Sequence, residues 1–248
     1  MQLDIAWENK AKNFATVTRL LAERPPAADS LVVLPEMFAT GFTMNTAVVA
    51  EDYGKETEQF LAGTAKRFGV FVLAGAALRG RGGLVRNKAL IFSPSGELMG
   101  FYAKMRPFTL GGEAKHFAAG ERPITFKWGG CVVSPFICYD LRFPEIFREV
   151  TRTHRPELFA VIANFPEKRI RHWVTLLQAR AIENQAYVVG VNRVGTDPYY
   201  HYVGRSIIVD PLGEIVADAD GSEGSIQWEL DLGNLRKYRE GLPFLADM

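Results

Sequence analysis

A cysteine at the end of an apolar run is the residue of this sequence best placed for chemistry. The run Cys131–Ile137 is typical of a buried strand, and Cys138 follows it directly, before polar residues and a helix start at Pro144. In open α/β sheets, ligands gather at the carboxyl ends of strands, where backbone N–H groups can face developing negative charge. We therefore interpret Cys138 as a candidate nucleophile. The alternative is that it is a small apolar core residue, and this is how we interpret Cys131.

Three charged residues occupy comparable positions elsewhere in the chain. Glu36 follows the apolar run Leu31–Leu34, Lys104 ends a predicted hairpin strand, and Glu113 comes soon after in a glycine-containing loop. Taken singly, each would most often be a solvated surface charge, and taken together they could form only an ion network. The apolar neighbours of Glu36 favour a position near a cleft.

The elements that must position these residues follow from the hydrophobic pattern. Short apolar runs alternate with amphipathic stretches, which predicts an α/β protein. The strands we expect are Leu3–Trp7, Leu31–Leu34, Val70–Leu78, Ala89–Phe92, Cys131–Ile137, Leu158–Asn164, Tyr187–Asn192 and Ile207–Val209. Helical spacing relates Phe14, Val17 and Leu21, then Phe60, Thr64 and Phe68, then Ile170, Trp173, Leu177, Arg180 and Asn184. Turns at 94–97 and 211–214 predict hairpins and hence mixed sheets.

Composition limits the classes of function. The chain has 248 residues, of which 48% are hydrophobic and 23% charged, which predicts a single domain over 1–248. A net charge of +1 gives no broad field for nucleic acid or an anionic membrane. No apolar stretch approaches the roughly 20 residues of a membrane span, and the first residues do not resemble a signal peptide.

The remaining signals concern compartment and cofactors. Two cysteines cannot form a disulfide framework, so we expect free thiols and a cytoplasmic location. P-loop, dinucleotide-binding, Gly-x-Ser-x-Gly and His-Glu-x-x-His motifs are missing from the sequence. The four histidines lack zinc-like spacing to a cysteine pair. We therefore expect neither a metal nor a cofactor.

Several segments together resemble the nitrilase superfamily of carbon–nitrogen hydrolases, almost from end to end. The matching pieces are Leu-Pro-Glu36-Met-Phe, Tyr-Ala-Lys104, Glu113, Cys138-Tyr-Asp-Leu-Arg-Phe-Pro-Glu, Ala163-Asn-Phe-Pro, His172-Trp173, Ala179-Arg-Ala-Ile-Glu-Asn-Gln and Asn192-Arg-Val-Gly. Among its branches, these pieces look most like the omega-amidases, which release ammonia from the side-chain amide of 2-oxoacids. One departure is Arg106-Pro107 before Phe108, where relatives usually carry His-Leu.

The resemblance implies a fold and a set of roles. The fold is an α-β-β-α sandwich of two mixed sheets with outer helices. Cys138 would attack the amide carbon, Glu36 would act as general base and acid, and Lys104 would stabilise the oxyanion together with the N–H of Tyr139. Glu36 or Glu113 would activate water to hydrolyse the thioester. The Lys104 ammonium would also favour the thiolate of Cys138.

The implied substrates are 2-oxoglutaramate and 2-oxosuccinamate, small molecules with a carboxylate remote from the amide. We expect Arg142 to bind this carboxylate through its planar fork of donors, with Phe42 and Phe165 as apolar walls. The alternative is that Arg142 pairs with Asp140 or Glu145 and only braces the loop.

Other interpretations stay open. The chain could act on a carbamoyl group, a nitrile or another amide, or it could be a non-catalytic binding protein on the same fold. We expect Arg180, Glu183 and Asn184 to support the scaffold. We also expect a homodimer or larger homo-oligomer, with Trp128 and 235–244 packing on a second subunit, although they could instead pack within one chain.

Overall fold

Two sheets form the centre of the protein. The computed structural model describes residues 1–248, apart from the side chain of Arg81. The first sheet has the strand order β1-β2-β3-β4 and contains β1 (Leu31–Val33), β2 (Phe71–Arg79), β3 (Val85–Phe92) and β4 (Leu98–Ala103). Strands β1 and β2 are parallel and the other neighbours antiparallel, so this sheet is mixed.

The second sheet is also mixed. Its order is β12-β11-β8-β7-β6-β5, formed by β5 (Phe126–Trp128), β6 (Cys131–Ile137), β7 (Leu158–Ile162), β8 (Tyr187–Val191), β11 (Ile207–Val209) and β12 (Ile215–Asp218). The central strands β6, β7 and β8 are parallel, and the outer pairs are antiparallel. A separate antiparallel pair joins β9 (Val194–Thr196) to β10 (His201–Val203).

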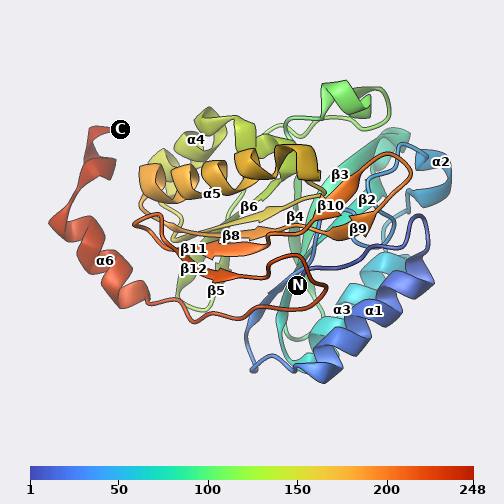
Figure 1. Ribbon diagram of the computed structural model, residues 1–248, viewed down its shortest axis with the longest axis horizontal. Coiled ribbons are helices and arrows are strands. Elements are labelled where there is room, and N and C mark those ends of the chain that lie inside the picture. The colour runs from blue at the N-terminus through green and yellow to red at the C-terminus, as the bar shows by residue number, and fades with distance from the viewer.

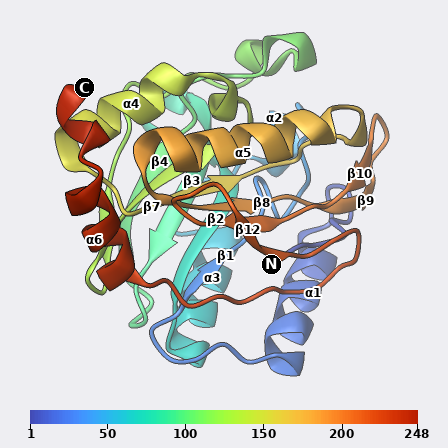
Figure 2. The ribbon, with the colours of Figure 1, turned by 60° about the vertical axis from the view of Figure 1, so that its left-hand side comes forward.

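Helices cover the outer faces of both sheets. Figures 1 and 2 show α1 (Lys10–Glu23) and α3 (Glu56–Phe68) on one side, and α4 (Pro144–His154) and α5 (Ile170–Asn184) on the opposite side, with the strands between them. The short helix α2 (Thr46–Val49) precedes α3, and α6 (Leu232–Gly241) lies near the C-terminus. Short 3-10 turns cover Arg81–Gly83, Thr109–Gly111, Glu113–Lys115, Cys138–Arg142, Glu167–Arg169 and Phe244–Asp247. The predicted α-β-β-α sandwich is confirmed.

One predicted strand is wrong. Within Leu3–Trp7 only Asp4 forms a bridge, an isolated one to Val194, and the preceding Gln2 forms another to Gly224. Leu3 and Ile5 nevertheless lie buried in the apolar cluster beneath α1 and α3. The alternation of apolar residues therefore reported burial correctly, but burial of alternate side chains does not require a continuous hydrogen-bonded ladder. Both predicted hairpins are present, at the β3–β4 and β11–β12 connections.

The C-terminal segment combines core packing with exposed apolar residues. Leu235 of α6 is buried in the core beside the second sheet, and Arg236 lies 2.8 Å from Glu157. Leu242 and Phe244 are 45% and 57% exposed. In Figure 2, α6 lies at the edge of the sandwich near α4. Packing within one chain thus accounts for Leu235 but not for the last apolar residues. Among the described residues, no helix is long and apolar enough to span a membrane.

Helix α5 packs closely on the second sheet because β8 carries a glycine at the contact. A Cβ atom at Gly190 would lie 2.3 Å from Cδ1 of Leu177 and 2.9 Å from Cζ2 of Trp173. Both of these α5 side chains are buried, so they have little room to move. The absence of a side chain at Gly190 sets the distance between this helix and the sheet.

We predict that Gly190→Ala lowers the free energy of unfolding by about 1–3 kcal/mol, because the added methyl overpacks this contact. Urea denaturation at constant m-value measures the change. Gly63→Ala is the matched control: it lies on the exposed face of α3 with open space around it, and we expect a gain of about 0.5–1 kcal/mol. Equal stability of the Gly190→Ala and wild-type proteins would contradict the packing argument.

Candidate active site

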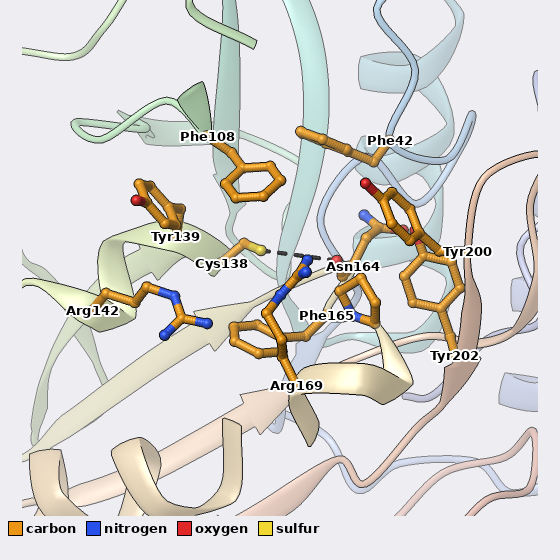
Figure 3. A pocket seen from close by; sticks show the side chains of 11 residues that line it. Phe42, Phe108, Cys138, Tyr139, Arg142, Asn164, Phe165, Arg169, Tyr200 and Tyr202 are labelled. Carbon is orange, nitrogen blue, oxygen red and sulfur yellow. Dashed lines mark hydrogen bonds between the residues drawn. The ribbon is translucent and has the colours of Figure 1, made fainter. Parts of the chain in front are cut away.

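The predicted charged residues meet in one buried cluster. Lys104 Nζ donates at 2.8 Å to Oε1 of Glu36 and at 2.8 Å to Oε2 of Glu113. All three side chains are buried. Cys138 faces the same region: its Sγ lies 3.9 Å from the carbonyl oxygen of Asn164, as the dashed line in Figure 3 shows. The structure thus brings the four predicted residues together at the ends of strands from both sheets.

Glu36 is positioned by a close approach of two backbones. It lies past the end of β1, where a Cβ atom on Gly75 of β2 would be 2.5 Å from the Glu36 Cα and from the Met37 nitrogen. Hydrogen bonds from Gly75 N to Pro35 O and from Phe38 N to Gly75 O, each 3.2 Å, hold the two segments together. Only glycine at position 75 leaves room for the Glu36 backbone.

Two asparagines to which the sequence analysis gave no role in the site hold the carboxylates. Asn87 of β3 donates through Nδ2 to Oε1 of Glu36 at 2.8 Å and to Oε1 of Glu113 at 2.9 Å. Asn164, just past β7, donates its backbone N–H to Oε2 of Glu36 at 2.9 Å. A polar residue within or directly after a buried apolar run was the available signal, because buried polar groups require partners.

Cys138 begins the turn Cys138–Arg142 with a φ of +47°, in the left-handed region that non-glycine residues rarely adopt. The buried Asp140 carboxylate holds this turn. It accepts hydrogen bonds from the Ile137 N–H at 3.0 Å, the Arg106 N–H at 2.9 Å and the Tyr102 hydroxyl at 2.8 Å. Burial chiefly raises the pKa of Asp140 to about 7. One carboxylate thus joins the residue before Cys138 to the segment after Lys104.

The loop that departs from the usual sequence is joined to the same cluster. Arg106 bonds to Asp140 through its backbone, and the Phe108 N–H donates to Oε2 of Glu113 at 2.6 Å. The loop that contains Arg106-Pro107 is therefore fixed by backbone contacts to Asp140 and Glu113. On the other side of the turn, Arg180 donates to the Leu141 carbonyl at 2.7 Å and pairs with Glu183 at 2.9 Å, which agrees with its expected supporting role.

Electrostatics keep the cysteine neutral before substrate binds. Burial raises the pKa of the Cys138 thiol well above its usual value, the charge of Glu36 raises it further, and Lys104 opposes these effects without overcoming them. Burial alone would lower the pKa of Lys104, but the carboxylates of Glu113 and Glu36 outweigh it and raise the pKa. Lys104 is therefore charged. As expected, it lowers the pKa of the Cys138 thiol, but desolvation has the larger effect and the pKa stays raised.

A pocket opens over Cys138. The residues that line it are Phe42, Phe108, Cys138, Tyr139, Arg142, Asn164, Phe165, Pro166, Arg169, Tyr200 and Tyr202 (Figure 3). The set includes Tyr139, Arg142, Phe42 and Phe165, which the sequence analysis named, whereas Arg169, Tyr200 and Tyr202 were missed. Aromatic side chains supply most of the walls, and the two guanidinium groups supply positive charge.

Arg142 lies against an aromatic wall of the pocket. Its guanidinium carbon is 5.4 Å from the centroid of the Phe165 ring, and Nη1 and Nη2 are each 3.3 Å from Nδ1 of His172. Asp140 is occupied by the donors described above, and Glu145 lies 3.5 Å from Arg106. The carboxylates that Arg142 could have braced thus have other partners.

Within the part of the chain that the structure describes, no group of three or more His, Cys, Asp and Glu side chains is arranged to hold a metal ion. The two carboxylates of the site, Glu36 and Glu113, hold the Lys104 ammonium instead.

Known proteins share this sequence and fold. Residues 1–240 match the sequence model of the family "Carbon-nitrogen hydrolase". A Yersinia enterocolitica protein named as an omega-amidase is 42% identical over 221 residues, covering 88% of this chain and 83% of that protein. A 2-oxoglutaramate amidase of Bacillus subtilis is 34% identical over 249 residues, covering 100% of this chain and 95% of that one.

A solved structure agrees with the fold. A protein from Xanthomonas campestris, described as a member of the CN-hydrolase superfamily, superposes with a TM-score of 0.94 at 33% identity, and the match covers 100% of this chain and 94% of that one. The match in sequence over nearly the whole chain, together with this superposition, shows that the protein belongs to the carbon-nitrogen hydrolase family.

Proposed function

We propose that this protein is an omega-amidase that hydrolyses the side-chain amide of 2-oxoglutaramate and 2-oxosuccinamate to the dicarboxylic oxoacid and ammonia. The observation that carries the proposal is the buried Glu36–Lys104–Glu113 cluster beside the Cys138 thiol, at a pocket whose walls include two arginines. The names of the Yersinia and Bacillus relatives support the same reaction.

The proposed reaction begins with the neutral thiol. As the Cys138 sulfur bonds to the amide carbon, its proton passes to Glu36. The carbonyl oxygen becomes an oxyanion, which the Lys104 ammonium stabilises. The N–H of Tyr139, second in the Cys138–Arg142 turn, supplies another donor because the first N–H groups of a helical turn lack partners within it.

Hydrolysis of the intermediate completes the cycle. The carbon–nitrogen bond breaks, the nitrogen takes the proton from Glu36, and ammonia leaves behind a thioester on Cys138. Water then gives a proton to Glu36 and attacks the thioester carbon. The carbon–sulfur bond breaks, the sulfur recovers a proton, and the acid product leaves.

A hydrogen bond between the Cys138 thiol and Glu36 contributes to the raised pKa of that thiol, and this contact favours Glu36 over Glu113 as the base that activates water. Glu113 accepts from Asn87 at one oxygen and from Lys104 and the Phe108 N–H at the other. These fixed donors make Glu113 suited to positioning Lys104.

The competing reactions are hydrolysis of a carbamoyl group, a nitrile or an uncharged amide. The guanidinium groups of Arg142 and Arg169 at the pocket favour a substrate that carries a carboxylate. Ammonia release from 2-oxoglutaramate, 2-oxosuccinamate, a carbamoylated amine, a nitrile and an uncharged amide tests the proposal. A higher kcat/KM for any of the last three would overturn it, and failure of every substrate to form an adduct on Cys138 would support a non-catalytic binding protein.

We further propose that the protein acts in the cytoplasm as a homodimer or larger homo-oligomer. The free thiols of Cys131 and Cys138 support a reducing compartment. The exposed Leu242 and Phe244 support contact with a second copy. The molar mass of the protein in solution, before and after Phe244→Glu, tests the assembly, and a monomeric wild-type protein would refute it.

We expect Cys138→Ala to abolish turnover and leave the fold intact, because the side chain is small and supplies the nucleophile. Cys131→Ala is the matched control: Cys131 is buried at the start of β6, the opposite end from Cys138, and it does not line the pocket, so its thiol does not meet the substrate. Ammonia release measures both variants. Retention of more than about a tenth of the wild-type rate by Cys138→Ala, a loss of only about 1.4 kcal/mol, would exclude the assignment.

Lys104→Met should bind substrate and barely turn it over, because an oxyanion donor acts mainly in the transition state. We expect kcat to fall by about a hundredfold or more. Steady-state kinetics with 2-oxoglutaramate separate kcat from KM, and urea denaturation checks the fold. A normal kcat with a raised KM would show that Lys104 acts in substrate binding and not in catalysis.

Arg142→Met should lose kcat/KM for 2-oxoglutaramate and keep its activity on pentanamide, which has the same chain length and no carboxylate. The planar guanidinium suits a carboxylate at the end of the substrate remote from the amide. Parallel assays of both substrates measure the effect. Equal losses on the two substrates, or none, would reject Arg142 as the carboxylate-binding residue.

A further inference from the structure

Arg169 is a second guanidinium of the pocket, at the end of the 3-10 turn Glu167–Arg169. Its Cζ lies 5.4 Å from the centroid of the Phe108 ring and 6.0 Å from that of the Tyr200 ring. Figure 3 shows the Arg169 side chain among the residues that line the pocket around Cys138. Two aromatic walls therefore hold this cation at the pocket.

Among the side chains that the structure describes, no carboxylate forms an ion pair with Arg169. Glu167, two residues earlier, lies 3.1 Å from His201, and Glu145 lies 3.5 Å from Arg106. Contact with ring faces attracts a guanidinium and leaves its in-plane N–H donors directed away from the rings. Such a cation is suited to an anion that arrives with the substrate.

Phe108 also links Arg169 to the reacting centre. The Phe108 N–H donates to Oε2 of Glu113 at 2.6 Å, and the same oxygen accepts from Lys104 at 2.8 Å. The aromatic wall beside Arg169 is therefore fixed relative to the ammonium that faces the oxyanion. An anion bound by Arg169 would be held at a set distance from the scissile amide.

We infer that Arg169 is a specificity-determining residue that binds the substrate carboxylate together with Arg142. The two guanidinium groups lie against different walls, Arg142 against Phe165 and Arg169 against Phe108 and Tyr200. Together they select short amides that end in a carboxylate. This inference rests on the proposed function, since it identifies the anion-binding residues of the same pocket.

A graded set of substrates tests the inference. Three amides of the same chain length are compared: 2-oxoglutaramate, glutaramate and pentanamide. Glutaramate lacks the oxo group, and pentanamide lacks both the oxo group and the carboxylate. We expect Arg169→Met to lower kcat/KM for the first two by about ten- to a hundredfold, as for the loss of a charged hydrogen bond, and to leave pentanamide unchanged. Lys168→Met is the matched control, because Lys168 is exposed, carries the same charge and is outside the pocket lining. It should leave all three substrates unchanged.

Equal losses on all three substrates would mean that Arg169 only supports the Phe108 wall, and this result would overturn the inference, as would no loss on any. A binding measurement gives a second readout that does not depend on turnover. In the Cys138→Ala protein, Arg169→Met should weaken the affinity for 2-oxoglutarate by about tenfold or more, and an unchanged affinity would also overturn it.

The wild-type protein distinguishes this failure from failure of the proposed function. If wild type prefers pentanamide to 2-oxoglutaramate, the omega-amidase proposal fails and the inference fails with it. If wild type prefers 2-oxoglutaramate and Arg169→Met keeps the same preference, only the role of Arg169 is refuted.

Discussion

The buried Lys104 ammonium, held between two carboxylates, is the interaction on which the site depends. A charge removed from water is stable only when partners replace its hydration, and Glu36 and Glu113 do so at 2.8 Å each. Removing either carboxylate would leave uncompensated charge inside the sandwich. The ion cluster therefore requires the turn after β1, the end of β4 and the loop after it to keep a fixed spacing.

Residues from both sheets form hydrogen bonds to this cluster. Asn87 on β3 of the first sheet bonds to both carboxylates, while Asn164 past β7 of the second sheet bonds to Glu36. Asp140 connects the turn at Cys138 to the backbone after Lys104. Hydrogen bonds inside a region of low dielectric are strong, and they reinforce one another. The relative position of thiol and ammonium is thus set by the contact between the sheets.

The pocket separates two electrostatic tasks. At its inner end, burial and Glu36 keep the Cys138 thiol neutral. Lys104 is charged there and can stabilise an oxyanion. At its walls, Arg142 and Arg169 lie against aromatic rings and offer donors to an anion. In our proposal, an amide with a remote carboxylate matches both ends, because its neutral group meets the thiol and its charged group meets the arginines.

The sequence by itself determined an α/β class and most of the strands, because apolar periodicity reports burial. The sandwich and the charged residues of the site followed from motifs that resemble those of the carbon–nitrogen hydrolases. The sequence could not determine that Leu3–Trp7 forms a single isolated bridge rather than a strand, since buried alternation looks the same in both cases. The tertiary structure alone decided the roles of Asn87 and Asp140, which satisfy buried partners from distant segments. It also decided the state of the Cys138 thiol, because desolvation and the neighbouring charges depend on how the two sheets pack together.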